Sequence, residues 1–172
     1  MGNIRRSRGY SFEHTLVQRL DRGEWHARRL GGSSTGLPDI IAVNNREAIL
    51  LSIEAKAGTS DILYVPQDQI QRCVYIRDMF KHYSKRHVIF AFKFMRKKRV
   101  KRKNCTVYEH RKLIEYYKIG DIFGNAKKIP VLKCNYDGNT FALHDDKCES
   151  LNLPNYVMPF HRMVDVIGKD EF

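Results

Sequence analysis

The chain has 172 residues, the length of one domain that can bury a real hydrophobic core. It carries 31 lysines and arginines against 19 aspartates and glutamates, a formal net charge of +12, and this excess favours polyanionic partners. Four cysteines lie far apart with no C-x-x-C pair, which argues against a zinc site and against a disulfide framework. No apolar run approaches the length of a membrane span and no signal-peptide core is visible, so we expect a cytoplasmic protein without a membrane partner.

The first predicted element is a helix over residues 11–22, preceded by a basic arm. The arm carries Arg5, Arg6 and Arg8, and the apolar positions Phe12, Leu16, Val17 and Leu20 of the helix follow helical spacing. Glu13 falls on the buried side, where a carboxylate is usually a rim residue but could also reach a metal ion. A first strand is expected over residues 25–30, and the Gly/Ser loop over 31–36 could let backbone amides approach a phosphate or could be a mere connector.

Two strands are predicted next, over residues 39–43 and 48–56, because both are rich in Ile, Leu and Val and are bounded by polar residues. The link over residues 44–47 is typical of a hairpin turn. The chain then predicts a second helix over residues 66–83, opened by proline, and another apolar strand over 87–94.

The hairpin matters because it sets the relation of Asp39 to Glu54. One loop length places Asp39 opposite Ser52 with Glu54 one diagonal step away, and a turn centred one residue later places Asp39 directly opposite Glu54. Both registers put Asp39, Ser52, Glu54 and Lys56 on one face, whereas a three-residue loop would separate Asp39 from Glu54.

A Pro38-Asp39 step followed fifteen residues after Asp39 by Glu54-Ala55-Lys56 is a pattern with which many Mg²⁺-dependent nucleases build their active sites. Two carboxylates can hold the metal, and the lysine can handle the attacking water and the developing phosphorane charge. Taken alone, a Pro-Asp step or a Glu-x-Lys sequence on a strand more often belongs to a solvent-exposed face than to an active site. The second strand is otherwise apolar, however, so charges at its end need partners or a metal, and the pattern favours a DNA endonuclease.

The later part of the chain predicts a strand over residues 108–119 and a hairpin over 129–143 that turns at Asp137-Gly138. The order helix, three strands, helix, strand indicates an α/β fold with a mixed sheet. We therefore expect a nuclease domain over residues 1–144 and a tail of unknown role over 145–172.

The helix over residues 66–83 carries two apolar stripes. One comprises Ile70, Cys73, Val74 and Phe80, and the other Tyr75, Ile76, Met79 and Tyr83. One stripe can cover the sheet of this chain and leave the second for a partner subunit, but the two can also form a single wide buried stripe.

Residues 96–103 form a basic insertion. Its seven cationic side chains are Arg96, Lys97, Lys98, Arg99, Lys101, Arg102 and Lys103. The run could be a clamp for a DNA arm, and a disordered basic loop or a localisation-like tract is an equal alternative.

Several motifs together resemble a known family. They are Arg29, Ser33, Pro38-Asp39, Ile53-Glu54-Ala55-Lys56, Leu63-Tyr64-Val65 and Gln69, preceded by a basic start over residues 5–9 and by Glu13. In identity and in order they resemble the archaeal Holliday junction resolvases of the PD-(D/E)xK nuclease superfamily, over roughly residues 5–95.

The resemblance implies a restriction-endonuclease-like core, here with an extra C-terminal β-rich extension. It implies a homodimer at the nucleoid that cuts four-way DNA junctions by paired symmetric cuts, with Mg²⁺ or, as a substitute, Mn²⁺. The implied metal ligands are Glu13, Asp39, Glu54 and the backbone carbonyl of Ala55, and the other implied catalytic residues are Lys56, Ser33 and Gln69. Implied DNA contacts are Arg29, Ser34 and Tyr64, beside the basic arm. The basic run exceeds the usual family core, and a DNA contact there is expected from its charge.

The chain departs from the family pattern at His14, where arginine is usual. Ser34 competes with Ser33, and Arg28 with Arg29, for the functional position. Another PD-(D/E)xK repair or restriction-type nuclease is an alternative, and so is an inactive DNA-binding module with the same fold. The intact set of Glu13, Asp39, Glu54 and Lys56 favours an enzyme over the inactive module.

Overall fold

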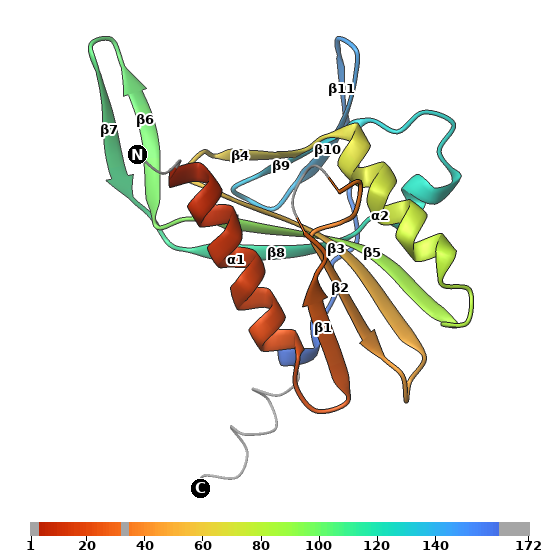
Figure 1. The fold of residues 1–172 in the computed structure, drawn as a ribbon. Coiled ribbons are helices and arrows are strands. Elements are labelled where there is room, and N and C mark those ends of the chain that lie inside the picture. The colour runs from red at the N-terminus through yellow and green to blue at the C-terminus, as the bar shows by residue number, and fades with distance from the viewer. Residues whose placement is uncertain (1–3, 32–34, 162–172) are drawn as a thin grey trace, which may run out of the picture.

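The computed structural model describes residues 4–31 and 35–161, with side chains from Arg8 onward, and arranges them as an α/β fold (Figure 1). Helices α1 (Ile4–Leu20) and α2 (Gln67–Met79) flank opposite faces of a mixed sheet, which confirms the predicted fold class. The strands of this sheet follow the order β1-β2-β3-β5-β8. They are β1 (Trp25–Arg29), β2 (Ile40–Asn44), β3 (Ile49–Gly58), β5 (Lys85–Phe94) and β8 (Ile114–Ile119). No helix in the described part of the chain is long and apolar enough to cross a membrane.

Strand β3 is central and buried on both faces. It pairs antiparallel with β2 and parallel with β5, and a parallel pair needs a long crossover, which α2 supplies. Ile49, Leu51 and Ile53 pack in the core under α1, so the alternate residues of β3 face α2. The predicted burial of this strand is therefore confirmed.

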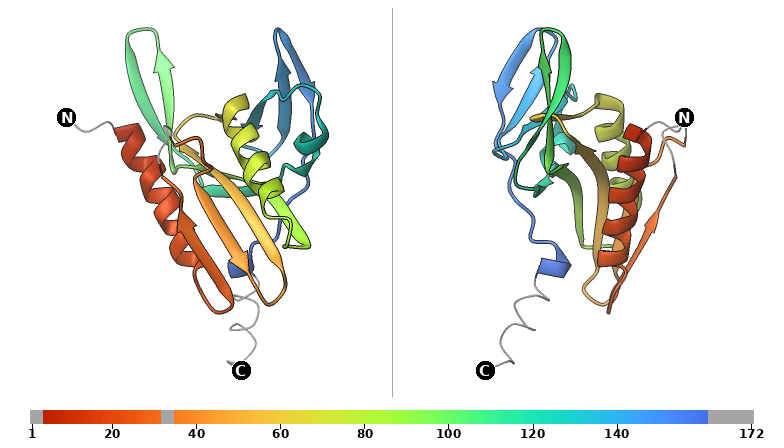
Figure 2. Two further views of the ribbon diagram at one scale, coloured as in Figure 1. Left: turned by 45° about the vertical axis from the view of Figure 1, so that its right-hand side comes forward. Right: turned by 90° about the vertical axis from the view of Figure 1, so that its left-hand side faces the viewer.

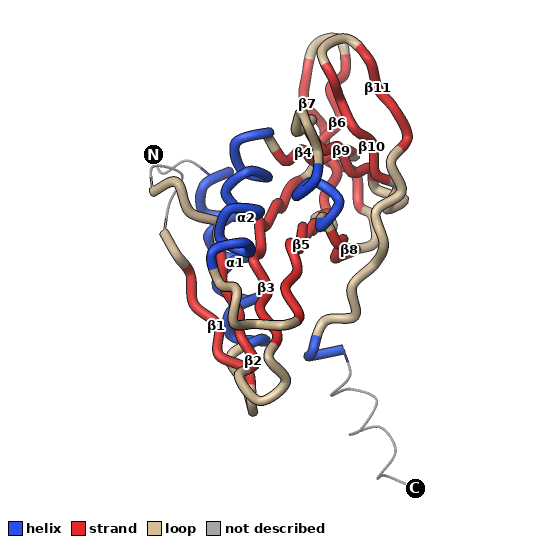
Figure 3. The backbone as a smooth tube through the Cα atoms, turned by 90° about the vertical axis from the view of Figure 1, so that its right-hand side faces the viewer, coloured by secondary structure: helices blue, strands red, loops and turns tan. Residues whose placement is uncertain are grey.

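A second sheet has the order β11-β10-β9-β4 and lies at the end of the first sheet where β5 finishes (Figure 3). Its strands are β4 (Ile62–Val65), β9 (Val131–Asn135), β10 (Thr140–His144) and β11 (Lys147–Ser150). The predicted turn at Asp137-Gly138 joins β9 to β10, and Gly138 adopts a φ of +84° there. Part of the segment expected to be a tail extends this sheet as β11 and buries Leu153 and Met158.

The basic run forms an ordered hairpin, so its interpretation as a disordered loop is wrong. Strand β6 (Lys97–Arg102) pairs antiparallel with β7 (Cys105–His110) and with no other strand of the described residues. The strand predicted over residues 108–119 is interrupted for the same reason, because its first residues belong to β7 and the rest to β8. The hairpin projects from the same end of the molecule as β10–β11 (Figure 2).

Both helices differ from their predicted bounds. Helix α1 already begins at Ile4, so the basic arm is its first part and not a separate extended segment. In α2, Ile76 is buried together with Ile70 and Cys73, which contradicts its place in a free second stripe. Tyr75 and Met79 alone remain as the strongly exposed apolar residues of α2.

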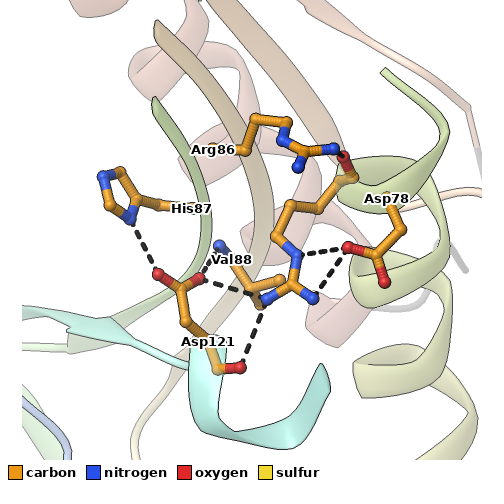
Figure 4. A network of polar contacts seen from close by, with 6 residues as sticks. Asp78, Arg86, His87, Val88 and Asp121 are labelled. Carbon is orange, nitrogen blue, oxygen red and sulfur yellow. Dashed lines mark hydrogen bonds and ion pairs between the residues drawn. The ribbon is translucent and has the colours of Figure 1, made fainter. Parts of the chain in front are cut away.

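A polar network fastens the short helix η1 (Asp121–Asn125) to β5 and α2 (Figure 4). The Asp121 carboxylate accepts the Val88 backbone N–H at 2.7 Å and lies 2.7 Å from Nδ1 of His87. Arg77 of α2 donates to the backbone oxygen of Asp121 at 3.2 Å. Burial alone would raise the pKa of Asp121, but these hydrogen bonds and the charges of His87 and Arg77 outweigh it and lower the pKa below its usual value.

Candidate active site

The site is built on the β2–β3 hairpin. Ile40 pairs with Ile53, and continuing this register by one residue places Asp39 opposite Glu54, the second of the two predicted registers. The Asp39 carboxylate accepts the backbone N–H of Ala55 at 2.8 Å, which fixes it against β3. The two carboxylates therefore share the face of the sheet that α2 covers.

Lys56 joins this pair from the same strand. Its Nζ lies 2.7 Å from Oε1 of Glu54, and the Glu54 side chain is only 2% exposed. Because β3 alternates its side chains, Glu54 and Lys56 point to the same face. The hairpin thus brings together Asp39, Glu54 and Lys56, as the sequence predicted.

The charge of Asp39 opposes the ionisation of Glu54. Burial raises the pKa of Glu54 to about 7, Lys56 works against this rise, and the charge of Asp39 adds to it. Glu54 also shares a hydrogen bond with Asp39 that favours its protonated form. Two acidic groups in such contact provide a place for a proton or a cation between them.

Glu13 approaches the site from α1 but is held by an arginine. Its Oε2 accepts from Nε and from a terminal nitrogen of Arg29, both at 2.8 Å. Burial and the charge of Asp39 raise the pKa of Glu13, and Arg29 opposes the rise. The guanidinium of Arg29 also lies 4.3 Å from the ring centroid of Tyr10, a cation–π contact.

Arg29 and Arg28 are neighbours on β1, and their side chains point to opposite faces of the sheet. Ala27 packs in the core under α1, so Arg29 points to the same side and reaches Glu13. Arg28 points the other way and pairs with Asp21 at 2.7 Å. His14 stacks on Tyr10, with ring centroids 6.3 Å apart, and thereby flanks the ring that Arg29 contacts.

Two buried polar atoms lie on the α2 side of the site without a hydrogen-bond partner among the described residues. They are Oγ of Ser52 and Oε1 of Gln69. Gln69 lies one turn before Cys73, whose thiol pKa is raised by burial and by the charge of Glu54. Helix α2 runs antiparallel to β3. Gln69, about 5.4 Å along the helix from Cys73 towards its N-terminus, therefore lies nearer the end of β3 that carries Glu54 and Lys56.

The donor set fits a hard divalent cation. Among the described residues no group of three or more His, Cys, Asp or Glu side chains is assembled to hold a metal, and Glu13 is engaged by Arg29. The paired carboxylates of Asp39 and Glu54 nevertheless offer oxygen ligands of the kind Mg²⁺ prefers, and Oε1 of Gln69 is a buried oxygen without a partner.

The other residues predicted for the site are the tyrosine of β4, the basic run, the basic arm and the two serines after β1. Tyr64 on β4 is exposed, and the basic run forms β6 and its flanks. Ser33 and Ser34 lie outside the described residues, as do the side chains of Arg5 and Arg6. Sequence reasoning missed Tyr10 and its contact with Arg29, although its position three residues before Glu13 on the helix was a usable signal.

Comparisons with known proteins found a matching family model and a similar solved structure. A solved structure similar to the chain is that of a Holliday junction resolvase from the archaeal hyperthermophile Archaeoglobus fulgidus, at 22% identity and a TM-score of 0.47. The similarity covers 74% of this chain and 87% of that one. No curated protein matches. The family model described as archaeal Holliday junction resolvase (hjc) matches residues 4–129, well over half of the chain. The chain therefore belongs to the archaeal Holliday junction resolvase family.

Proposed function

We propose that the chain is a Mg²⁺-dependent endonuclease that resolves four-way DNA junctions by two symmetric phosphodiester cuts. The observation that carries this is the carboxylate pair of Asp39 and Glu54, with Lys56 held 2.7 Å from Glu54. Family membership supports branched DNA as the substrate.

In this proposal Asp39, Glu54 and the backbone carbonyl of Ala55 hold Mg²⁺, with Mn²⁺ as a substitute and Glu13 as a further ligand. The bound ion would supply Lewis acidity and a more acidic water. Lys56 keeps its ammonium group at the carboxylate pair, where it can orient a water and stabilise negative charge on the phosphate. Gln69 presents an unpaired oxygen that can accept a hydrogen bond from that water.

The phosphate is held from the α1 side. Arg29 is fixed by Glu13 and Tyr10, and its remaining N–H groups can donate to a phosphate oxygen. Ser33 and Ser34, which follow β1 in the sequence, are proposed as further contacts to the DNA, as are Tyr64 and Arg8. Two cuts on opposing strands need two sites related by a two-fold axis, so a homodimer completes the proposal.

The test is cleavage of a synthetic four-way junction and of a linear duplex with the same arm sequences, in Mg²⁺, in Mn²⁺ and in EDTA. We expect paired nicks in the junction with either metal, intact linear duplex, and no product in EDTA. Equal cleavage of the linear duplex would instead indicate a repair or restriction-type nuclease. Binding of the junction without cleavage in either metal would indicate an inactive DNA-binding module.

A further inference from the structure

The β6–β7 hairpin is an addition to the fold. It connects β5 to β8, which already pair as antiparallel neighbours with Phe94 opposite Ile114. A turn of a few residues is sufficient to join such strands. The chain instead inserts residues 95–113, which add nothing to the first sheet. A role outside the packing of the core is therefore needed to explain them.

The two faces of this ribbon differ in charge. On one face Lys98 pairs with Asp61 and Arg102 lies 3.8 Å from Glu109, so their charges are compensated. On the other face stand Lys97, Arg99 and Lys101, because side chains alternate along β6. All three are exposed, and none forms an ion pair within the described part of the chain.

The partners of this second face on β7 bring no negative charge. Lys97, Arg99 and Lys101 lie opposite His110, Tyr108 and Thr106, respectively. Tyr108 is half exposed, so an aromatic ring lies among the cations. A basic surface interleaved with an aromatic residue is complementary to the phosphates and sugars of DNA.

The base of the ribbon is fastened to the β3–β4 connection. Arg111 donates to Asp61 at 2.8 Å, to the backbone oxygen of Met95 at 2.8 Å and to that of Ser60 at 3.0 Å. Arg99 N–H adds a bond of 2.9 Å to the oxygen of Thr59. These anchors fix the direction of the ribbon relative to β3, which carries Glu54 and Lys56.

We propose that the face of the ribbon with Lys97, Arg99 and Lys101 binds the phosphate backbone of one duplex arm of the junction, away from the cut. Six residues per strand give a reach of about 20 Å, the length of roughly six base pairs. A two-stranded ribbon is also narrow enough to enter a major groove. This role rests on the DNA cleavage function proposed above, but it concerns affinity for an arm and not the chemistry.

The test compares two triple variants with equal loss of charge. One changes Lys97, Arg99 and Lys101 to Gln. The control changes Lys81, Lys85 and Lys127 to Gln, which are exposed and lie off the ribbon. Binding of a labelled four-way junction is measured by fluorescence anisotropy in EDTA over a series of salt concentrations, so cleavage does not enter. Thermal unfolding checks that both variants remain folded.

For the ribbon variant we expect the slope of log K against log salt to become shallower by about 2.7, the value for three lost phosphate contacts, while the control keeps nearly the wild-type slope. A second variant replaces residues 101–106 by Asn-Gly between Val100 and Val107, which removes Lys101 of the three together with Arg102 and Lys103. Because the proposal assigns phosphate contacts only to Lys97, Arg99 and Lys101, the expected change in slope is about 0.9. Equal slopes for the ribbon variant and the wild type, or equal changes in ribbon and control variants, would overturn the proposal. Failure of the wild type to cleave in Mg²⁺ would refute the proposed function and leave this binding result standing.

Discussion

At the scale of single residues, Asp39 is the sharpest probe of the proposed chemistry. Asp39→Asn keeps the shape and can still accept the Ala55 N–H, but it removes one charged oxygen ligand. A lost metal ligand costs several kcal/mol at the transition state, so cleavage of a junction should fall by about 10³-fold in single-turnover assays. Junction affinity in EDTA should stay unchanged, because it comes mainly from basic contacts to phosphate.

The control for this change is Asp68→Asn, an identical substitution on the exposed side of α2, where Asp68 pairs with Arg72. It should leave the cleavage rate as in the wild type. Wild-type cleavage by Asp39→Asn would remove the carboxylate pair from the mechanism.

The sequence predicted which residues come together in the site better than it predicted the hydrogen bonds and ion pairs that they form. Asp39, Glu54 and Lys56 are found together because a strand repeats every two residues, a rule that sequence reasoning can apply. The choice between Arg28 and Arg29 depends on which side chains of β1 face α1. The burial of Ala27 in the structure shows this, but the basic sequence around Ala27 does not. The ion pair between Arg29 and Glu13 depends on the packing of β1 against α1, so a local sequence pattern could not predict it either.

At the scale of elements, the turn between β2 and β3 contains a strained residue. Ala48 adopts a φ of +53°, a left-handed conformation that costs a non-glycine residue about 1–2 kcal/mol. Ala48→Gly should therefore raise the free energy of unfolding by about 0.5–1 kcal/mol, after allowance for the larger entropy of glycine in the unfolded chain. Urea denaturation measures the difference.

Ala57→Gly in β3 serves as the comparison, because Ala57 has no positive φ. There the loss of the side chain should lower the free energy of unfolding by about 0.5–1 kcal/mol. Destabilisation of similar size by both changes would contradict the strain assigned to Ala48.

The same turn explains why the hairpin register stayed open in the sequence. The loop comprises residues 45–48, and its polar composition predicts a turn without fixing its length. Its left-handed position holds Ala48 in place of the usual Gly or Asn, so the usual marker is missing. Strand β6 was not predicted for another reason. Its sequence, Lys97–Arg102, shows no alternation of apolar and polar residues, and the segment is extended because it pairs with β7.

The anchor of η1 predicts a dependence of stability on pH. The pKa of Asp121 is lowered in the folded state, so its carboxylate stabilises the fold above its unfolded-state pKa, and this contribution disappears as pH falls through the folded-state pKa. Asp121→Asn can still accept the Val88 N–H but loses the charge facing His87 and Arg77. We expect a loss of about 1 kcal/mol at pH 6 that begins to shrink below about pH 4, the unfolded-state pKa of an aspartate, and disappears only below the lowered folded-state pKa.

Chemical denaturation across this pH range provides the measurement. Asp68→Asn is again a suitable control, because an exposed i,i+4 ion pair on a helix contributes only about 0.3–0.5 kcal/mol. A difference between wild type and Asp121→Asn that stays constant from pH 6 to pH 3 would refute the electrostatic role of Asp121.

At the scale of the whole molecule, the proposed homodimer has a candidate surface on α2. Tyr75 and Met79, one turn apart, are 65% and 53% exposed. Changing both to Ser should convert a dimer to a monomer in light scattering at micromolar concentration, and paired cuts should give way to single nicks. Tyr108→Ser on the β6–β7 hairpin, where the side chain is 50% exposed, should leave the dimer intact. A wild type that is monomeric both alone and on junction DNA would refute the dimer.

The local origin of the carboxylate pair also bears on the order of folding. Asp39 and Glu54 meet within one hairpin, whereas β3 and β5 pair only after the chain has closed a crossover through α2. Short loops close at lower entropic cost than long ones, so the hairpin can form early and the parallel pair later. The early hairpin would bring two like charges together before α2 covers Glu54 and Lys56 and brings Gln69 to the site. A divalent cation that relieves this repulsion would favour the early hairpin as well as the finished site.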